Sequence, residues 1–238
     1  MFDFTDQVVV VTGAAGRLGR AVAESFLGAG ARLALVDRAS DRLPRLYPAL
    51  GEAAEHLLVN AVDVTDADAV ASMAAVVVDY FEQIDVLVNV VGGYRAGRPV
   101  HETDVATWDH MLSLNARSAF LVSRAVVPHM LESGRGKIVN VAARAALAGG
   151  KNAAAYSAAK AALVRLTESM AEELKGAGIN VNCVLPGTID TPQNREAMPK
   201  ADHSRWVAPE AIADVILFLA SEAARAVHGA AIPVYGLS

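Results

Sequence analysis

The sequence has few of the features that mark secreted, membrane-spanning or nucleic-acid-binding proteins. Its 238 residues include one cysteine, Cys183, which excludes an internal disulfide bond and suits a reducing compartment. Because Cys183 lies in an apolar run, we expect it to be an inert core residue. The net charge is −5 and there is no basic block, which argues against nucleic acid as the main partner.

No segment predicts a targeting signal, a membrane span or a metal site. Residues 1–6 are acidic and lack the basic region and long apolar segment of a signal peptide. The most apolar helix candidate, residues 69–78, is far shorter than a membrane span. We therefore expect a cytoplasmic protein without membrane association. No metal is expected, because no metal-ligand spacing occurs among His56, His101, His110, His129, His203 and His228.

Short β-branched runs alternate with amphipathic helical patterns along the whole chain. Residues 7–12 form a continuous run typical of a strand buried on both faces. Because parallel strands need crossover connections, the alternation predicts an α/β fold: a doubly wound (Rossmann-type) parallel sheet of about seven strands with helices on both faces. The expected strands are residues 7–12, 32–36, 57–62, 84–91, 138–142, 179–185 and 231–234, and the expected helices begin near residue 18, cover 66–81, 104–132 and 210–219, and include Tyr156.

The chain predicts one domain over residues 1–238, since it contains neither a Gly/Ser linker nor an internal repeat. In such a sheet, ligands bind outside the carboxyl ends of the strands. The residues that follow the expected strands, and should therefore border one crevice, are Gly13, Asp37, Asp63, Gly92, Ala143 and Pro186.

A glycine-rich turn, residues 13–19, joins the first strand to the first helix and predicts a dinucleotide site. Asp37 ends the second strand, where a carboxylate accepts the two ribose hydroxyls of adenosine and repels a 2′-phosphate, which favours NAD over NADP. Arg17 and Arg38 weigh against this choice, because either guanidinium could bind a 2′-phosphate. The alternative for Asp37 is that it only closes a turn.

Asp63 ends the third expected strand, where an adenine edge would lie. The alternative is that Asp63 belongs to a capped loop in which Thr65 or Asp66 is the helix N-cap. Both interpretations are open at this point.

Tyr156 and Lys160 lie four residues apart and therefore on one face of a helix. A lysine ammonium beside a phenol favours the phenolate, which makes the tyrosine a usable proton donor and acceptor. The alternative is an ordinary helix surface, because the pattern also occurs by chance.

Taken together, these motifs resemble the short-chain dehydrogenase/reductase family over nearly the whole chain. The resemblance implies a Rossmann-type sheet, a nicotinamide cofactor and hydride transfer to or from a carbonyl or similar group. The features that carry it are Thr12-Gly13 with its glycine turn, Asp63, Asn89-Val90-Val91-Gly92, Asn115, Tyr156-Ser157-Ala158-Ala159-Lys160 and Pro186-Gly187-Thr188-Ile189-Asp190-Thr191.

The resemblance implies a role for each matched residue. Tyr156 would donate the proton in reduction and accept it in oxidation, Lys160 would bind the nicotinamide ribose and lower the tyrosine pKa, and Asn115 would hold a water on the proton path. The cofactor-binding residues that we expect from the motifs and the resemblance are Gly13, Gly16, Arg17, Leu18, Gly19, Asp37, Arg38, Asp63, Val64, Asn89, Gly92, Tyr156, Lys160, Pro186, Thr188, Ile189 and Thr191.

The chain departs from the family pattern at four places. Arg17 occupies the middle glycine of the usual turn, so that the glycines follow the spacing of the family's longer branch. Asn-Asn-Ala-Gly has become Asn89-Val90-Val91-Gly92, and Tyr235 replaces an acid or small residue. The fourth departure is Ala143, at the position of the serine that polarises the substrate carbonyl. Losing one such donor can cost about 10²–10³ in rate.

A narrower resemblance bears on this missing serine. Residues 92–94, 143–147 and 190–202, together with Trp206, are similar to stretches of quinonoid dihydropteridine reductases. That branch also lacks the serine and keeps the tyrosine and lysine, and its quinonoid substrate accepts hydride with little polarisation. Tyr94 would then stack against a flat ring.

Two functional hypotheses follow. The first is an NAD(H)-dependent oxidoreductase for a small carbonyl or quinonoid substrate, which is either activated or polarised by Tyr94, Arg144 or Asn152. The second is a dinucleotide-binding sensor or assembly protein without turnover, for which Ala143 is the reason.

The resemblance also implies a homodimer or homotetramer. Small residues flank the helix of Tyr156 and permit close packing against a second subunit, although packing on the chain's own sheet is the alternative. These residues are Ala153, Ala154, Ala158, Ala161 and Ala162.

Overall fold

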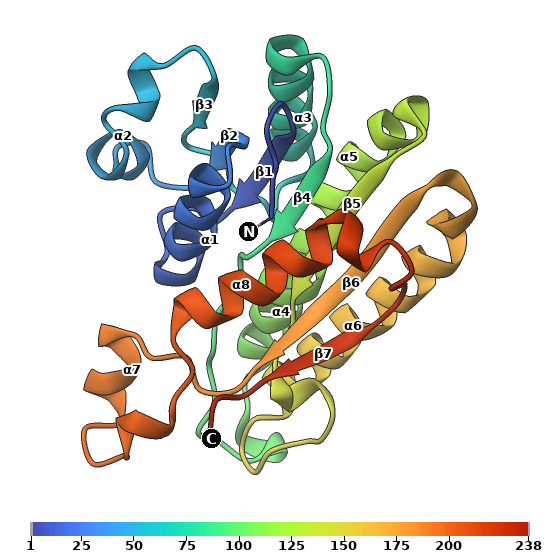
Figure 1. Cartoon of the computed structure of the whole chain (residues 1–238). Coiled ribbons are helices and arrows are strands. Elements are labelled where there is room, and N and C mark those ends of the chain that lie inside the picture. The colour runs from blue at the N-terminus through green and yellow to red at the C-terminus, as the bar shows by residue number, and fades with distance from the viewer. Residues whose placement is uncertain (1, 238) are drawn as a thin grey trace.

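Seven parallel strands form one sheet in the order β3-β2-β1-β4-β5-β6-β7 in the computed structural model, which describes residues 2–237 (Figure 1). The order reverses between β1 and β4, and in open α/β sheets ligands bind at this point of reversal. The predicted fold class is therefore confirmed. The strands are β1 (Val8–Thr12), β2 (Arg32–Val36), β3 (His56–Val59), β4 (Val86–Asn89), β5 (Gly136–Val141), β6 (Ile179–Pro186) and β7 (Ala231–Val234).

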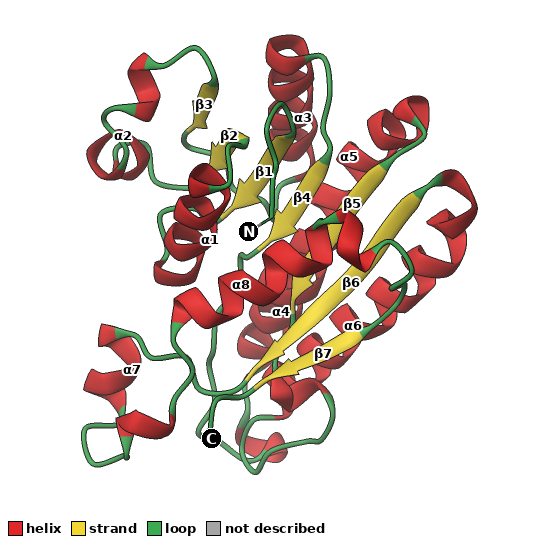
Figure 2. Ribbon diagram, viewed as in Figure 1, coloured by secondary structure: helices red, strands yellow, loops and turns green. Residues whose placement is uncertain are grey.

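Helices cover both faces of the sheet, as the alternating pattern predicts (Figures 1 and 2). Helices α1 and α8 pack together on one face, and α3, α5 and α6 supply the core of the other. The helices are α1 (Arg17–Gly28), α2 (Arg42–Leu46), α3 (Ala67–Phe81), α4 (Val105–Leu112), α5 (Ser118–Ser133), α6 (Ala154–Leu174), α7 (Pro192–Ala197) and α8 (Pro209–Ala220).

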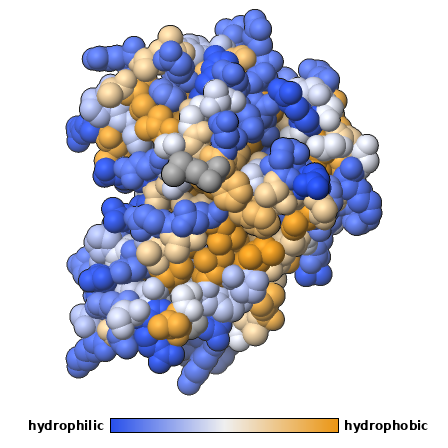
Figure 3. Space-filling view, viewed as in Figure 1, coloured by the Kyte–Doolittle hydropathy of each residue, from blue (hydrophilic) through white to orange (hydrophobic). Residues whose placement is uncertain are grey.

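The outer surface of α8 and the edge strand β7 is unusually apolar. Figure 3 shows hydrophobic side chains gathered over these two elements, between more hydrophilic regions. Phe2 and Phe218 are both about one-third exposed there, and their ring centroids are 6.3 Å apart. Such patches on a surface are typical of association sites.

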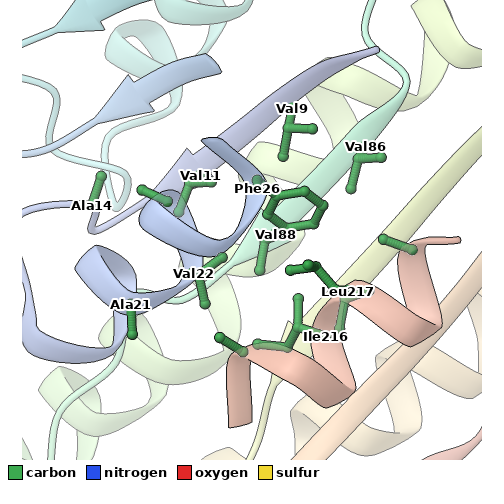
Figure 4. Packing of buried hydrophobic residues seen from close by; sticks show 14 of the residues in the cluster. Val9, Val11, Ala14, Ala21, Val22, Phe26, Val86, Val88, Ile216 and Leu217 are labelled. Carbon is green, nitrogen blue, oxygen red and sulfur yellow. The ribbon is translucent and has the colours of Figure 1, made fainter. Parts of the chain in front are cut away.

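The core beneath α1 and α8 shows why the first strand is a continuous apolar run. All five residues of β1 are buried, because a parallel strand in the middle of the sheet is covered on both faces. Val9 and Val11 meet Phe26 of α1, and Ile216 of α8 packs over the same region (Figure 4). Complete burial of each large side chain contributes about 1.5–3 kcal/mol.

Two predicted strands are too long at their ends. The strand expected over residues 57–62 ends at Val59, because Ala61 adopts a left-handed backbone with φ 61° that a strand excludes. The strand expected over residues 84–91 covers only Val86–Asn89. The amide of Val90 donates to the side-chain Oγ1 of Thr12 and not to a backbone carbonyl of β1, so the sheet pairing stops there.

The helical region expected over residues 104–132 is interrupted by a π-helical turn, Ser113–Arg117. Asp104 caps α4 by accepting a hydrogen bond from the amide of Thr107, and α5 resumes directly after the turn. Single π turns inside α-helices occur often at functional sites. This one contains Asn115.

Within residues 2–237, no helix is long and apolar enough to cross a bilayer. The same residues contain no cluster of three or more histidine, cysteine, aspartate or glutamate side chains that could hold a metal ion. Cys183 is fully buried, and burial raises the pKa of its thiol to about 11. The thiol is therefore protonated near neutral pH and unreactive.

Candidate active site

The glycine turn brings backbone closely against backbone between β1 and α1. Gly13 has φ +67°, which favours glycine, and its carbonyl accepts from the amide of Gly16 at 2.9 Å. A Cβ on Gly19 would stand 2.2 Å from the carbonyl oxygen of Gly13. The start of α1 can approach the turn only because Gly19 has no side chain.

We expect Gly19→Ala to destabilise the protein by about 1–3 kcal/mol, because the new methyl must push backbone apart. Binding of NADH should weaken at least tenfold if the turn holds the cofactor phosphates, since a 1.4 kcal/mol change is about tenfold. Chemical denaturation and fluorescence titration measure the two effects. Gly28→Ala in the same helix is the control, because its Cβ would meet nothing within 4 Å. Equal stability of the two variants would contradict the expectation.

Asp37 has a structural role beside the turn as well as a place in the cleft. Its carboxylate is buried and accepts from the amide of Ala15 at 3.1 Å and the amide of Ala39 at 3.0 Å. Arg42 donates to the carbonyl of Ala15 at 2.7 Å. Asp37 therefore closes the turn and also lines the cleft wall, and its expected role toward the adenosine ribose stays a prediction.

Asp63 forms the capped loop of the second interpretation, and its expected contact with adenine stays a prediction. Its Oδ1 accepts from the amide of Thr65 at 2.9 Å and from the hydroxyl of Thr65 at 2.7 Å, and these bonds lower the pKa of Asp63. Asp66 is the N-cap of α3, as one alternative predicts. Asp63 and Val64 also line the cleft.

These residues line one cleft of about 820 Å³ at the carboxyl ends of the strands. The cleft runs from the glycine turn past Asp37 and Asp63 to Tyr156 and Lys160. No side chain among the described residues caps the N-terminus of α1, so its amides remain available to an anion. A glycine-lined turn, an open helix terminus and a buried carboxylate together fit a nicotinamide dinucleotide.

Asn115 connects the π turn to the loop after β4. Its Oδ1 accepts from the amide of Gly93, and its Nδ2 donates to the carbonyls of Gly93 and Met111, each at 3.0 Å. Asn115 is fully buried, so these bonds are shielded from water. The geometry makes Asn115 a positioning residue for the loop; its expected role in holding a water stays a prediction.

Lys160 is buried and its ammonium donates to the carbonyl of Val141 at 2.8 Å. A Cβ on Gly92 would stand 3.0 Å from Lys160 Nζ and 2.9 Å from Asn115 Oδ1, so both polar atoms adjoin this glycine. Burial lowers the pKa of Lys160 to about 8. The carbonyl of Val141, the last residue of β5, thus orients the Lys160 ammonium, and burying that charge costs free energy.

Tyr156 lies in the same cleft, where its ring contacts Tyr94. The two ring centroids are 4.9 Å apart and the planes meet at 84°, an edge-to-face contact. Burial, and to a lesser degree the neighbouring Tyr94, raises the pKa of Tyr156 to about 12. The expected lowering by Lys160 is therefore wrong for this arrangement, because the ammonium is directed at Val141 and desolvation of the phenol dominates.

The end of β5 offers no side-chain hydroxyl to the cleft. Ala142 lines the cleft and Ala143 is buried with an extended backbone. Arg144 follows on a short 3-10 turn, and its guanidinium lies 5.2 Å from the ring centroid of Tyr235. Asn152 has a left-handed φ of 60° and faces a separate cavity beside α4.

The remaining predicted site residues divide into two groups. Asn89 is buried and donates to Asn140 Oδ1 at 2.9 Å, so it braces the sheet below the cleft. Pro186 is buried in β6 and Thr188 lies next to the cleft, its carbonyl accepting from the amide of Val207. The predicted residues that line the cleft are Gly13, Gly16, Arg17, Leu18, Gly19, Asp37, Arg38, Asp63, Val64, Gly92, Tyr156, Lys160, Ile189 and Thr191.

Several cleft residues were not predicted. Arg42 and Thr65 follow β2 and β3, where a loop position is visible in sequence but the direction of a side chain is not. Others come from the end of α4 and from the π turn, which has no sequence pattern of its own: His110, Ser113 and Leu114. Gln193 and Asn194 of α7 also line the cleft, in the stretch whose resemblance marks it as the substrate side.

Comparisons with known proteins agree with this geometry. A sequence model described as short chain dehydrogenase matches residues 7–202. The chain belongs to this family. Its fold is also that of a crystal structure of levodione reductase, with a TM-score of 0.90 and 31% identity over 98% of this chain and 97% of that one.

Relatives of known activity are similar to this short-chain dehydrogenase over nearly their whole length. One is 2-(R)-hydroxypropyl-CoM dehydrogenase of Xanthobacter autotrophicus, 35% identical over 97% of each chain. Another is cis-4-hydroxycyclohexanecarboxylate dehydrogenase of Sinomonas cyclohexanicum, 37% identical over 98% of this chain and 96% of the relative. Short-chain dehydrogenases are oxidoreductases that use nicotinamide dinucleotide cofactors, and this chain has the fold and the cleft for that chemistry.

Proposed function

We propose that the protein is an NAD(H)-dependent oxidoreductase that interconverts a small carbonyl compound and its alcohol, with Tyr156 as proton donor and acceptor. The observation that carries the proposal is the single cleft that joins the glycine turn and Asp37 to Tyr156 and Lys160. A binding site for a dinucleotide and a proton-transfer group thus share one space. That combination is what hydride transfer requires.

The chain's own residues supply binding and proton transfer, and bound NADH supplies the hydride. Tyr156, with its pKa raised to about 12, is protonated near neutral pH, which is the form needed to donate a proton to a carbonyl oxygen. Lys160 lines the same cleft, where the carbonyl of Val141 holds its ammonium, and both Lys160 Nζ and Asn115 Oδ1 adjoin Gly92. In the oxidative direction, the phenolate of Tyr156 accepts the proton of the alcohol.

The preference for NAD over NADP rests on Asp37. A buried carboxylate at the cleft wall accepts ribose hydroxyls and disfavours a 2′-phosphate, because like charges placed together cost several kcal/mol. Arg38 and Arg42 line the same part of the cleft and favour a phosphate. The carboxylate is buried and fixed by two backbone amides, so we assign it the larger effect.

We expect Asp37→Asn to lower the ratio of kcat/KM for NADH to that for NADPH by at least about tenfold, because it removes the repulsion and leaves both arginines. Initial-rate kinetics with each cofactor measure the ratio. Asp41→Asn is the control, since Asp41 is in the same loop but pairs with the exposed Arg45. An unchanged ratio in Asp37→Asn would show that Asp37 does not select the cofactor.

The substrate class is a small carbonyl or alcohol, and a quinonoid ring is the alternative. The names of the relatives support alcohols of small or ring-containing compounds. Ala143 and the exposed ring of Tyr94 support an activated, planar substrate. A steady-state screen with NADH and NADPH against levodione, quinones, 3-oxoacyl thioesters and quinonoid dihydropterin separates these classes. No turnover with any of them would contradict the proposal.

A second function, binding of a dinucleotide without turnover, is favoured by Ala143 alone. On this view the protein is a sensor or assembly partner. Cofactor binding with no activity, and no gain of activity in Ala143→Ser, would support it. Turnover by the unchanged protein would exclude it. The retained Tyr156, Lys160 and Asn115 favour the enzyme, since a binding protein has little need of them.

We also propose a homodimer or homotetramer, without nucleic acid or membrane partners, in the cytoplasm. The apolar surface over α8 and β7 supports association there (Figure 3). The small residues on α6 support a second contact. Light scattering on the purified protein measures the mass. A monomer at micromolar concentration would contradict this part of the proposal.

A further inference from the structure

The methyl group of Ala143 leaves the cleft without the donor that polarises a carbonyl, and three other side chains could replace it. These are Tyr94, Arg144 and Asn152. Among the described residues that line the cleft, Tyr94 is present with Tyr156 and Ala142, whereas the other two are not. Asn152 faces the separate cavity, and Arg144 lies over Tyr235.

The position of Tyr94 is fixed from two sides. Its ring meets the ring of Tyr156 edge to face, with centroids 4.9 Å apart. The preceding residue, Gly93, is held by Asn115 through hydrogen bonds to both its amide and its carbonyl. A Cβ on Gly93 would stand 2.7 Å from Leu114, so the loop also packs closely against the π turn.

Tyr94 nevertheless remains accessible to a substrate. It is 70% exposed, whereas most large aromatic side chains of the core are covered. Aromatic residues that are this exposed but held in place are well suited to ligand contact, because little entropy is lost on binding. The phenol hydroxyl adds a hydrogen-bond donor to this apolar ring.

We propose that Tyr94 is the catalytic residue that donates a hydrogen bond to the substrate oxygen, in place of the hydroxyl missing at Ala143. The inference rests on the proposed oxidoreductase function. The substrate oxygen would then lie between two phenols, one that transfers its proton and one that keeps it. A flat carbonyl or quinonoid ring fits against the exposed face of Tyr94.

The step is balanced without any further reactant. In reduction, bound NADH would supply the hydride for the new C–H bond at the carbonyl carbon, and the C=O π electrons would move to oxygen. Tyr156 gives its proton to that oxygen, and Tyr94 retains its own proton throughout. Tyr94 stabilises the developing negative charge, which is the function of an oxyanion donor.

Tyr94→Phe tests the proposal, because it removes the hydroxyl and keeps the ring that contacts Tyr156. With NADH and levodione, we expect kcat/KM to fall about 10²-fold. With 9,10-phenanthrenequinone, an activated dicarbonyl that needs less polarisation, the loss should be clearly smaller. Adding Ala143→Ser to Tyr94→Phe should restore levodione reduction at least about tenfold, since a second donor now reaches the same oxygen.

Controls separate this outcome from misfolding and from failure of the proposed function. Arg95→Gln alters the next residue, which lines the separate cavity, and should leave the rates unchanged. The thermal melting point and NADH affinity of Tyr94→Phe should match those of the unchanged protein. Normal turnover by Tyr94→Phe, or no rescue by Ala143→Ser, overturns this inference alone. No turnover by the unchanged protein with either probe overturns it together with the proposed function.

Discussion

Tyr156→Phe should turn over substrate at least about 10³-fold more slowly than the unchanged protein, because general acid catalysis by a positioned side chain contributes about 10²–10⁴-fold in rate. The phenylalanine keeps the edge-to-face contact with Tyr94 and removes only the hydroxyl. NADH binding should therefore stay within about twofold, since surface and packing change little. Steady-state kinetics and fluorescence titration measure the two quantities.

The pH dependence of the unchanged enzyme provides a second measurement of the same group. Because the pKa of Tyr156 is raised to about 12, the phenol is protonated at neutral pH, and alcohol oxidation, which needs the phenolate, should accelerate as pH rises. Tyr80→Phe is the matched control, since the Tyr80 hydroxyl donates to the carbonyl of Ala54, outside the cleft. If Tyr156→Phe kept more than about one tenth of the activity of the unchanged protein, Tyr156 would not be the proton donor.

Lys160→Met should abolish activity and, at neutral pH, stabilise the fold. The ammonium is fully buried and its pKa is lowered to about 8, which corresponds to roughly 3 kcal/mol against the charged form. Loss of the hydrogen bond to Val141 offsets about 1 kcal/mol. We therefore expect Lys160→Met to be about 2 kcal/mol more stable at pH 7.

The sign of this effect changes with pH. Between pH 8 and 10.5, the folded protein releases the proton of Lys160 while the unfolded chain retains it, so the unfolded state binds more protons and stability rises with pH. The advantage of Lys160→Met should therefore shrink across this range. Cys183 is coupled to Lys160, whose charge lowers the thiol pKa, so Lys160→Met raises the pKa of Cys183 further and adds to the loss of the variant's advantage as pH rises.

Urea denaturation of both proteins at pH 7, 8.5 and 10 measures this difference. Lys175→Met is the control, because Lys175 is exposed and pairs with Glu172 on the surface. Its stability should differ little from that of the unchanged protein. If Lys160→Met were less stable at pH 7, the buried lysine would stabilise the fold rather than burden it.

The main features of the fold were accessible from sequence because they depend on local patterns. The β-branched run of β1 and the periodic apolar residues of α3, from Val70 to Phe81, each specify their element without distant partners. The early end of β3 could not be predicted from sequence, because the residue type of Ala61 does not indicate its left-handed backbone. Glycine or asparagine would have marked it.

The sequence predicts those parts of the candidate site that depend on the spacing of residues along the chain. It does not predict the parts that depend on the direction of side chains in the folded protein. The spacing of four residues from Tyr156 to Lys160 predicts a shared helical face, and both residues line one cleft. The same spacing does not reveal that the Lys160 ammonium is directed at Val141, or that burial raises the tyrosine pKa. Desolvation depends on the assembled core.

The bonds between Asn115 and Gly93 have a consequence for motion in the active site. These bonds join the loop that carries Tyr94 to the π turn between α4 and α5. The loop therefore does not move independently of these helices at Gly93. Displacing Tyr94 from the cleft would require rearrangement of a helical turn. Substrate entry is therefore expected to depend on the part of the cleft lined by the short helix α7, which lies outside the sheet.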